Sequence, residues 1–228
     1  MRHEKMTDCV KSGCGCSQNL AFNGLAPGYQ RRLWAVIAIN AVMFAVEMGA
    51  GAMSGSQALK TDALDFFGDT LTYGLSLAVI GLPLRVRATT AVVKGITLGL
   101  MGLWIFGSTV WHAFAPGVPV AEIMGSIGFL ALAANLASVL ILLKYKDGDA
   151  NVRSVWLCSR NDAVGNVAVI LSAYVVWGTA SGWPDILVAA ILASIFLHSA
   201  TKILGQALDE WRRQSDGPAE MIAVVGRT

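Results

Sequence analysis

Residues 58–82 read ALKTDALDFFGDTLTYGLSLAVIGL, a mostly apolar stretch that contains three aspartates. Its length is that of a membrane-spanning helix, which needs about 20 predominantly apolar residues. Asp62, Asp65 and Asp69 follow one another at intervals of three and four residues, so they share one face of such a helix. Carboxylates inside a membrane are costly, and two that lie one turn apart repel each other when both are ionised. The spacing therefore predicts a site that holds a cation or protons.

The composition of the whole chain is that of a membrane protein. Of its 228 residues, 55% are hydrophobic and 14% are charged, whereas about 25% of residues are charged in soluble domains. The net charge of +2 gives no indication of a nucleic-acid partner. The first residues lack the apolar core of a secretory signal peptide. We therefore expect the lipid bilayer to be the partner of most of the surface.

Six apolar segments are each long enough to span a bilayer, and together they predict an all-α membrane protein. They cover residues 33–51, 58–82, 91–114, 120–143, 155–177 and 184–204. We expect residues 31–207 to form one domain of six transmembrane helices. Residues 1–30 and 208–228 are then a Cys-containing tail and a short second tail.

Basic residues predict the orientation of these six segments. Lys and Arg lie before the first segment, in the second and fourth connections, and after the last segment, at Arg31, Arg32, Arg85, Arg87, Lys94, Lys144, Lys146, Arg153, Lys202, Arg212 and Arg213. The other three connections carry neither residue, apart from Lys60 at the start of the second segment. By the positive-inside rule, both termini are cytoplasmic.

The N-terminal tail contains three cysteines, Cys9, Cys14 and Cys16. Thiolates favour soft metals such as zinc, cadmium, copper(I) or mercury, so one interpretation is that the tail captures metal. The alternative is a disordered tail whose cysteines bind nothing, since a structural zinc site would use four ligands at a more regular spacing.

The fifth segment carries a second pair of polar side chains. Cys158 and Asp162 are four residues apart, so they share a helix face, and Asn166 continues the same line. Glu47 in the first segment is either a proton carrier, a partner of the aspartates, or a side chain that hydrogen-bonds to another helix. A lone cysteine in a membrane helix is usually a small apolar residue, but its place one turn before Asp162 favours a ligand.

The pairs Asp65/Asp69 and Cys158/Asp162 would together supply the four ligands that zinc prefers. Such a cluster binds protons when it is empty, so metal and protons compete for it. Counted from the outer helix ends, Asp69 lies about 20 Å deep and Asp162 about 23 to 27 Å deep. Spacing alone therefore leaves open whether the two pairs meet.

These motifs resemble those of the cation diffusion facilitator family. The resemblance covers residues 30–212 and rests on the Asp-x-x-Asp-x-x-x-Asp motif of Asp62, Asp65 and Asp69, on Cys158/Asp162, and on Trp183-Pro184-Asp185. It implies a divalent-metal/proton antiporter that exports zinc, or a similar metal such as cadmium, across a bacterial inner membrane. It also implies a homodimer in many members, here through the transmembrane helices.

Two features depart from that family's pattern. Cys158 stands where the family usually has His, which favours thiophilic ions such as cadmium or mercury alongside zinc. Only about 16 residues follow Arg212, too few for the cytoplasmic domain with which many members end. We therefore expect a variant without that domain.

Other classes of protein remain open. A membrane metal sensor that does not transport, or a structural membrane protein, could use the same acids to hold helices together. An intramembrane aspartyl protease would carry Tyr-Asp and Gly-x-Gly-Asp motifs, whereas Asp69 follows Phe67-Gly68 and Asp162 follows Arg160-Asn161. We therefore expect no enzyme activity and no resident cofactor.

Overall fold

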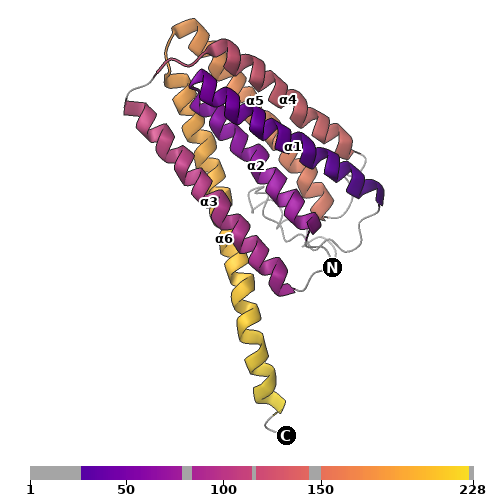
Figure 1. Ribbon diagram of the computed structural model, residues 1–228. Coiled ribbons are helices and arrows are strands. Elements are labelled where there is room, and N and C mark those ends of the chain that lie inside the picture. The colour runs from indigo at the N-terminus through magenta and orange to yellow at the C-terminus, as the bar shows by residue number, and fades with distance from the viewer. Residues whose placement is uncertain (1–26, 79–83, 115–116, 144–149, 226–228) are drawn as a thin grey trace, which may run out of the picture.

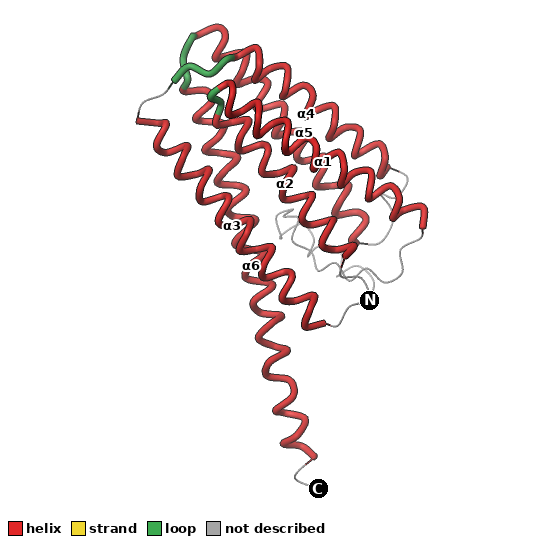
Figure 2. Tube along the Cα trace, in the orientation of Figure 1, coloured by secondary structure: helices red, strands yellow, loops and turns green. Residues whose placement is uncertain are grey.

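The computed structural model describes residues 27–78, 84–114, 117–143 and 150–225; among others, the side chains of residues 150–161 and 210–225 lie outside the description. This part of the chain forms helices joined by short connections, with no strand among the described residues (Figure 2). The helices are α1 (Pro27–Ser54), α2 (Gln57–Ala78), α3 (Leu84–Phe114), α4 (Ala121–Leu142), α5 (Ala150–Thr179) and α6 (Trp183–Val225). The predicted all-α architecture with six helices is confirmed.

Five of the six described helices are long and apolar enough to cross a membrane. The exception is α2, because Lys60 and the three aspartates interrupt its apolar sequence. Neighbouring protein surrounds α2 instead, since it contacts α1, α3, α5 and α6. The acidic helix is therefore the central element of the fold.

The helices form a four-helix bundle with a pair beside it (Figure 1). In the bundle, α1 contacts α2 and α4, and α5 contacts α4 and α2. The pair consists of α3 and α6, and α6 also packs against α2 and α5. Beyond the bundle α6 continues as a single helix, passing the boundary predicted at residue 207 (Figure 1).

Three connections meet at one end of the bundle, which we call the connection end. The turn between α1 and α2 contains Gly55, whose φ of 77° is one that a residue with a side chain rarely adopts. The backbone N–H of Val120, just before α4, donates to the carbonyl of Ser54 at 3.0 Å. Asp185, at the start of α6, bonds to the residues that follow Gly55. Thus α2, α4 and α6 all begin at this end.

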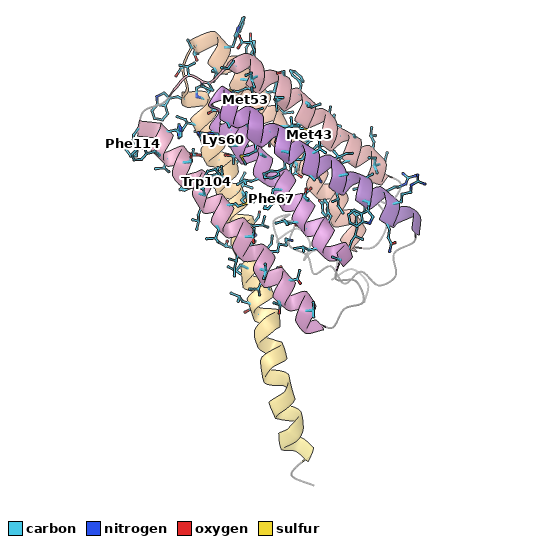
Figure 3. The ribbon with its side chains drawn as sticks, viewed as in Figure 1. Met43, Met53, Lys60, Phe67, Trp104 and Phe114 are labelled. Carbon is cyan, nitrogen blue, oxygen red and sulfur yellow. The ribbon has the colours of Figure 1, made fainter. Side chains whose placement is uncertain are left out.

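Apolar side chains fill the interior in separate clusters. Near the connection end, one cluster joins the bundle helices through Ala50, Leu59, Met124 and Val169 and reaches α6 at Leu192. A second cluster joins α2 to the α3–α6 pair. On the outside, Trp104 and Phe114 of α3 are 63% and 85% exposed and point away from the other helices (Figure 3), as expected for a lipid-facing surface.

Candidate metal centre

The predicted acid face of α2 points into the protein. Asp62 and Asp69 are 1% and 6% exposed, and Asp65 between them is half-buried. The hydroxyl of Tyr73, one turn beyond Asp69, donates to Asp69 Oδ2 at 2.8 Å. On the same face, Asp62 Oδ2 has no hydrogen-bond partner of standard geometry among the described residues.

The fifth helix brings Asp162 to this face. Asp162 is half-buried and lies within electrostatic range of Asp69, Asp65 and Asp62. The two helices meet at Gly165, since a Cβ at this position would stand 3.6 Å from Asp62 Oδ1, an ordinary van der Waals distance. Two helices that are distant in the sequence thus direct four carboxyl groups toward one region.

The four-residue site predicted from the sequence is described in part. Asp65, Asp69 and Asp162 have described side chains, whereas the side chain of Cys158 lies outside the description. No group of three or more His, Cys, Asp or Glu among the described side chains could hold a metal ion. Of the accessory candidates, Asp62 has a described side chain, whereas Cys9, Cys14 and Cys16 lie outside the described residues. The ligand set therefore stays a prediction.

The first helix adds a further acid to the same interior. Glu47 of α1 is fully buried and lies within electrostatic range of Asp62 and Asp65. Neither of its carboxylate oxygens has a hydrogen-bond partner among the described residues. Glu47 is nonetheless close enough to Asp62 for the two carboxyl groups to share a proton, which fits both a partner of the aspartates and a side chain that hydrogen-bonds to another helix.

A lysine lies beside the aspartates as well. Lys94 is half-buried inside α3 and lies within electrostatic range of Asp69. Its position among basic residues near a helix end suggested an orientation signal alone. Lys94 lies inside the helix that begins at Leu84 rather than at its end. This position was the overlooked sign in the sequence that Lys94 could reach an acid of α2. Lys94 thus offsets part of the negative charge of the four aspartates.

Asp185 has a role that the sequence did not predict. It is 2% exposed and accepts hydrogen bonds from Ser56 Oγ at 2.6 Å, from the Gln57 N–H at 2.8 Å and from the Ala58 N–H at 3.0 Å. Ser56 Oγ in turn accepts from the N–H of Leu59 at 3.1 Å. A carboxylate from α6 therefore satisfies the free N–H groups at the start of α2. It fixes the end of the helix that carries the aspartates.

Buried acids from three helices, inside a bundle of long apolar helices, define an integral membrane protein with an acidic interior site. Residues 33–210 match the model of the cation efflux transmembrane domain. The chain belongs to this family.

Curated relatives match at low identity. A zinc transporter ZitB of Pectobacterium atrosepticum is 26% identical over 197 residues, covering 80% of this chain and 61% of that protein. The metal cation efflux system protein CzcD of Cupriavidus metallidurans is 24% identical over 194 residues, with coverage of 80% and 61%. A cadmium, cobalt and zinc/H(+)-K(+) antiporter of Bacillus subtilis is 26% identical over 174 residues, with coverage of 69% and 55%. The chain thus spans about three fifths of the length of these relatives.

Proposed function

We propose that this protein is a divalent metal cation/proton antiporter that exports zinc, or a similar soft metal such as cadmium, from the cytoplasm. The transported ion binds between α2 and α5, at Asp65, Asp69, Cys158 and Asp162. The membrane is a bacterial inner membrane, and copies of the chain pair through their transmembrane helices. The relatives named for zinc, cadmium and cobalt transport support the class of ion, and none of those names describes an enzyme.

The observation that carries this proposal is the contact between α2 and α5. The two helices run antiparallel, because α2 begins and α5 ends at the connection end. Gly165 lies against Asp62, so counting three residues along each helix brings Asp65 level with Asp162. Four more residues bring Asp69 level with position 158. This register supports one site made of both pairs.

Charge explains why such a site exchanges metal for protons. Neighbouring carboxylates repel one another when all are ionised, so the empty site takes up protons. A divalent cation needs deprotonated ligands and therefore releases those protons when it binds. A thiolate at Cys158 would favour soft ions over hard ones. The N-terminal tail would raise the local concentration of such ions at the cytoplasmic side, through the thiols of Cys9, Cys14 and Cys16.

The direct test is metal uptake into proteoliposomes with an imposed pH gradient. We expect gradient-dependent uptake of zinc or cadmium by the unaltered protein, and its loss in Asp69→Ala and in Asp162→Ala. Glu122→Gln is a matched control, because Glu122 is an exposed acid on α4 away from the site. Uptake at the unaltered rate in either aspartate variant, from protein that elutes as a single folded species, refutes the site. No uptake of any ion by the unaltered protein favours a metal sensor.

The selectivity of the site is tested by Cys158→His. Imidazole suits zinc, whereas thiolate binds cadmium and mercury more strongly. We expect the variant to keep zinc transport and to lose its preference for cadmium by about tenfold, the order of effect seen when groups around a metal site change. Competition between zinc and cadmium in the proteoliposome assay measures this ratio. An unchanged ratio means that Cys158 is no ligand.

A further inference from the structure

The proposed four-residue site does not use one group of buried polar side chains. It consists of Glu47 on α1, Asp62 on α2 and Asn166 on α5. Each is at most 1% exposed, and each has side-chain atoms without a hydrogen-bond partner among the described residues. Buried polar groups are nearly always paired, so unpaired groups on three facing helices call for an explanation.

The two carboxyl groups of this cluster are neighbours. Glu47 lies beside Asp62, close enough for the two carboxyl groups to share a proton. Apart from that contact, both oxygens of Glu47 and Oδ2 of Asp62 have no partner among the described residues. As ionised groups neither can donate a hydrogen bond to the other. Burying two unpaired like charges is strongly unfavourable, and a bound cation removes that cost.

The fifth helix completes the cluster with an amide. Asn166 follows Gly165, the residue that lies against Asp62 Oδ1. It is also one turn beyond Asp162, on the helix face that approaches α2. Neither its Oδ1 nor its Nδ2 has a partner. The amide oxygen is therefore available as a third oxygen donor.

The cluster adjoins the four-residue site and is closed toward the connection end. Asp62 lies one turn from Asp65, about 4.5 Å along the helix axis. Beyond it, apolar side chains of α2, α4 and α5 pack together at Leu59, Met124 and Val169. An ion that left Asp65 and Asp162 toward the connection end would meet this cluster before the apolar layer.

We propose that Glu47, Asp62 and the amide oxygen of Asn166 form a second divalent-cation site, made only of oxygen donors. It receives the ion from the site between α2 and α5 and holds it beneath the apolar layer before release. Its position on an export route rests on the proposed function, whereas its capacity to bind a cation does not. Because it contains no thiolate, it accepts harder ions than a site with Cys158 would.

Manganese(II) is the probe for this site, since carboxylate and carbonyl oxygens suit it. The binding assay uses the full-length purified protein with Cys9, Cys14 and Cys16 changed to Ser, and free manganese is measured by electron paramagnetic resonance. We expect Glu47→Gln and Asp62→Asn each to weaken binding by about tenfold or more. The exposed controls Glu122→Gln and Asp209→Asn keep the affinity of the parent. Asn166→Asp, which adds a carboxylate, tightens binding, a gain that misfolding cannot produce.

The proposal is overturned if the parent binds no manganese, or if both carboxyl variants bind it like the parent. The transport assay separates this outcome from failure of the proposed function. If uptake depends on Asp162 but the protein binds no manganese, the antiporter proposal stands and the second site is refuted. If manganese binding depends on Glu47 and Asp62 but the protein transports no ion, the second site stands and the antiporter proposal is refuted.

Discussion

At the scale of single residues, Asp185 shows how a side chain from a distant helix can determine where another helix begins. The first N–H groups of a helix have no partner within it. For α2, Asp185 accepts from Gln57 and Ala58, and Ser56 Oγ accepts from Leu59. A carboxylate at this position also interacts favourably with the helix dipole. Trp183-Pro184-Asp185 resembled the family, and the structure gives a physical reason for the aspartate.

Replacing Asp185 with Ala should therefore destabilise the protein. It removes three hydrogen bonds to a buried carboxylate, and we expect a loss on the order of 3 kcal/mol. Asp185→Asn should cost less, because its single amide oxygen can still accept. Thermal unfolding in detergent, followed by tryptophan fluorescence, measures both. Asp209→Ala is the control, since Asp209 is an exposed acid on the same helix. Equal melting temperatures for Asp185→Ala and the parent would show that the cap contributes nothing.

At the scale of helices, the sequence predicted the number and order of the elements but not their ends. All six apolar segments became helices, yet α3 begins at Leu84 rather than 91, and α6 extends to Val225 rather than 204. Apolar residues mark the part of a helix that lipid or protein covers. Backbone hydrogen bonding continues into polar sequence, and in α6 the helix runs on past Gly217 and Pro218.

The contact between α2 and α5 was harder to predict than the positions of the aspartates on each helix. The spacing of Asp62, Asp65 and Asp69 was enough to identify the acid face. Depths counted from helix ends disagreed by several ångströms, because tilt and packing, rather than length, set the level of a residue. In the structure, Gly165 of α5 lies at the level of Asp62. Nothing in the sequence distinguishes this glycine among the 24. Lys94 and Asp185 were similarly undervalued, since their partners come from other helices.

At the scale of the whole molecule, the two ends of the bundle differ in their content of basic residues. The connection end joins α1–α2, α3–α4 and α5–α6, and its described connections at residues 55–56, 117–120 and 180–182 contain no Lys or Arg. At the opposite end, Arg31 and Arg32 lie in the first turns of α1, and Arg32 Nη1 donates to the carbonyl of Ile141 near the end of α4 at 3.0 Å. From the positive-inside rule, we propose that this basic end faces the cytoplasm.

Cysteine labelling tests this orientation and, with it, the direction of transport. In a background with the four native cysteines changed to Ser, Gly117→Cys and Ser181→Cys introduce single thiols at the connection end, and Asp209→Cys introduces one far along α6. We expect a membrane-impermeant maleimide to label the first two in intact cells, because these connections face outside. Asp209→Cys should react only after permeabilisation. The opposite pattern would mean that the protein has the inverse orientation in the membrane. The ion path from the α2–α5 acids toward Leu59, Met124 and Val169 would then lead into the cell instead of out of it.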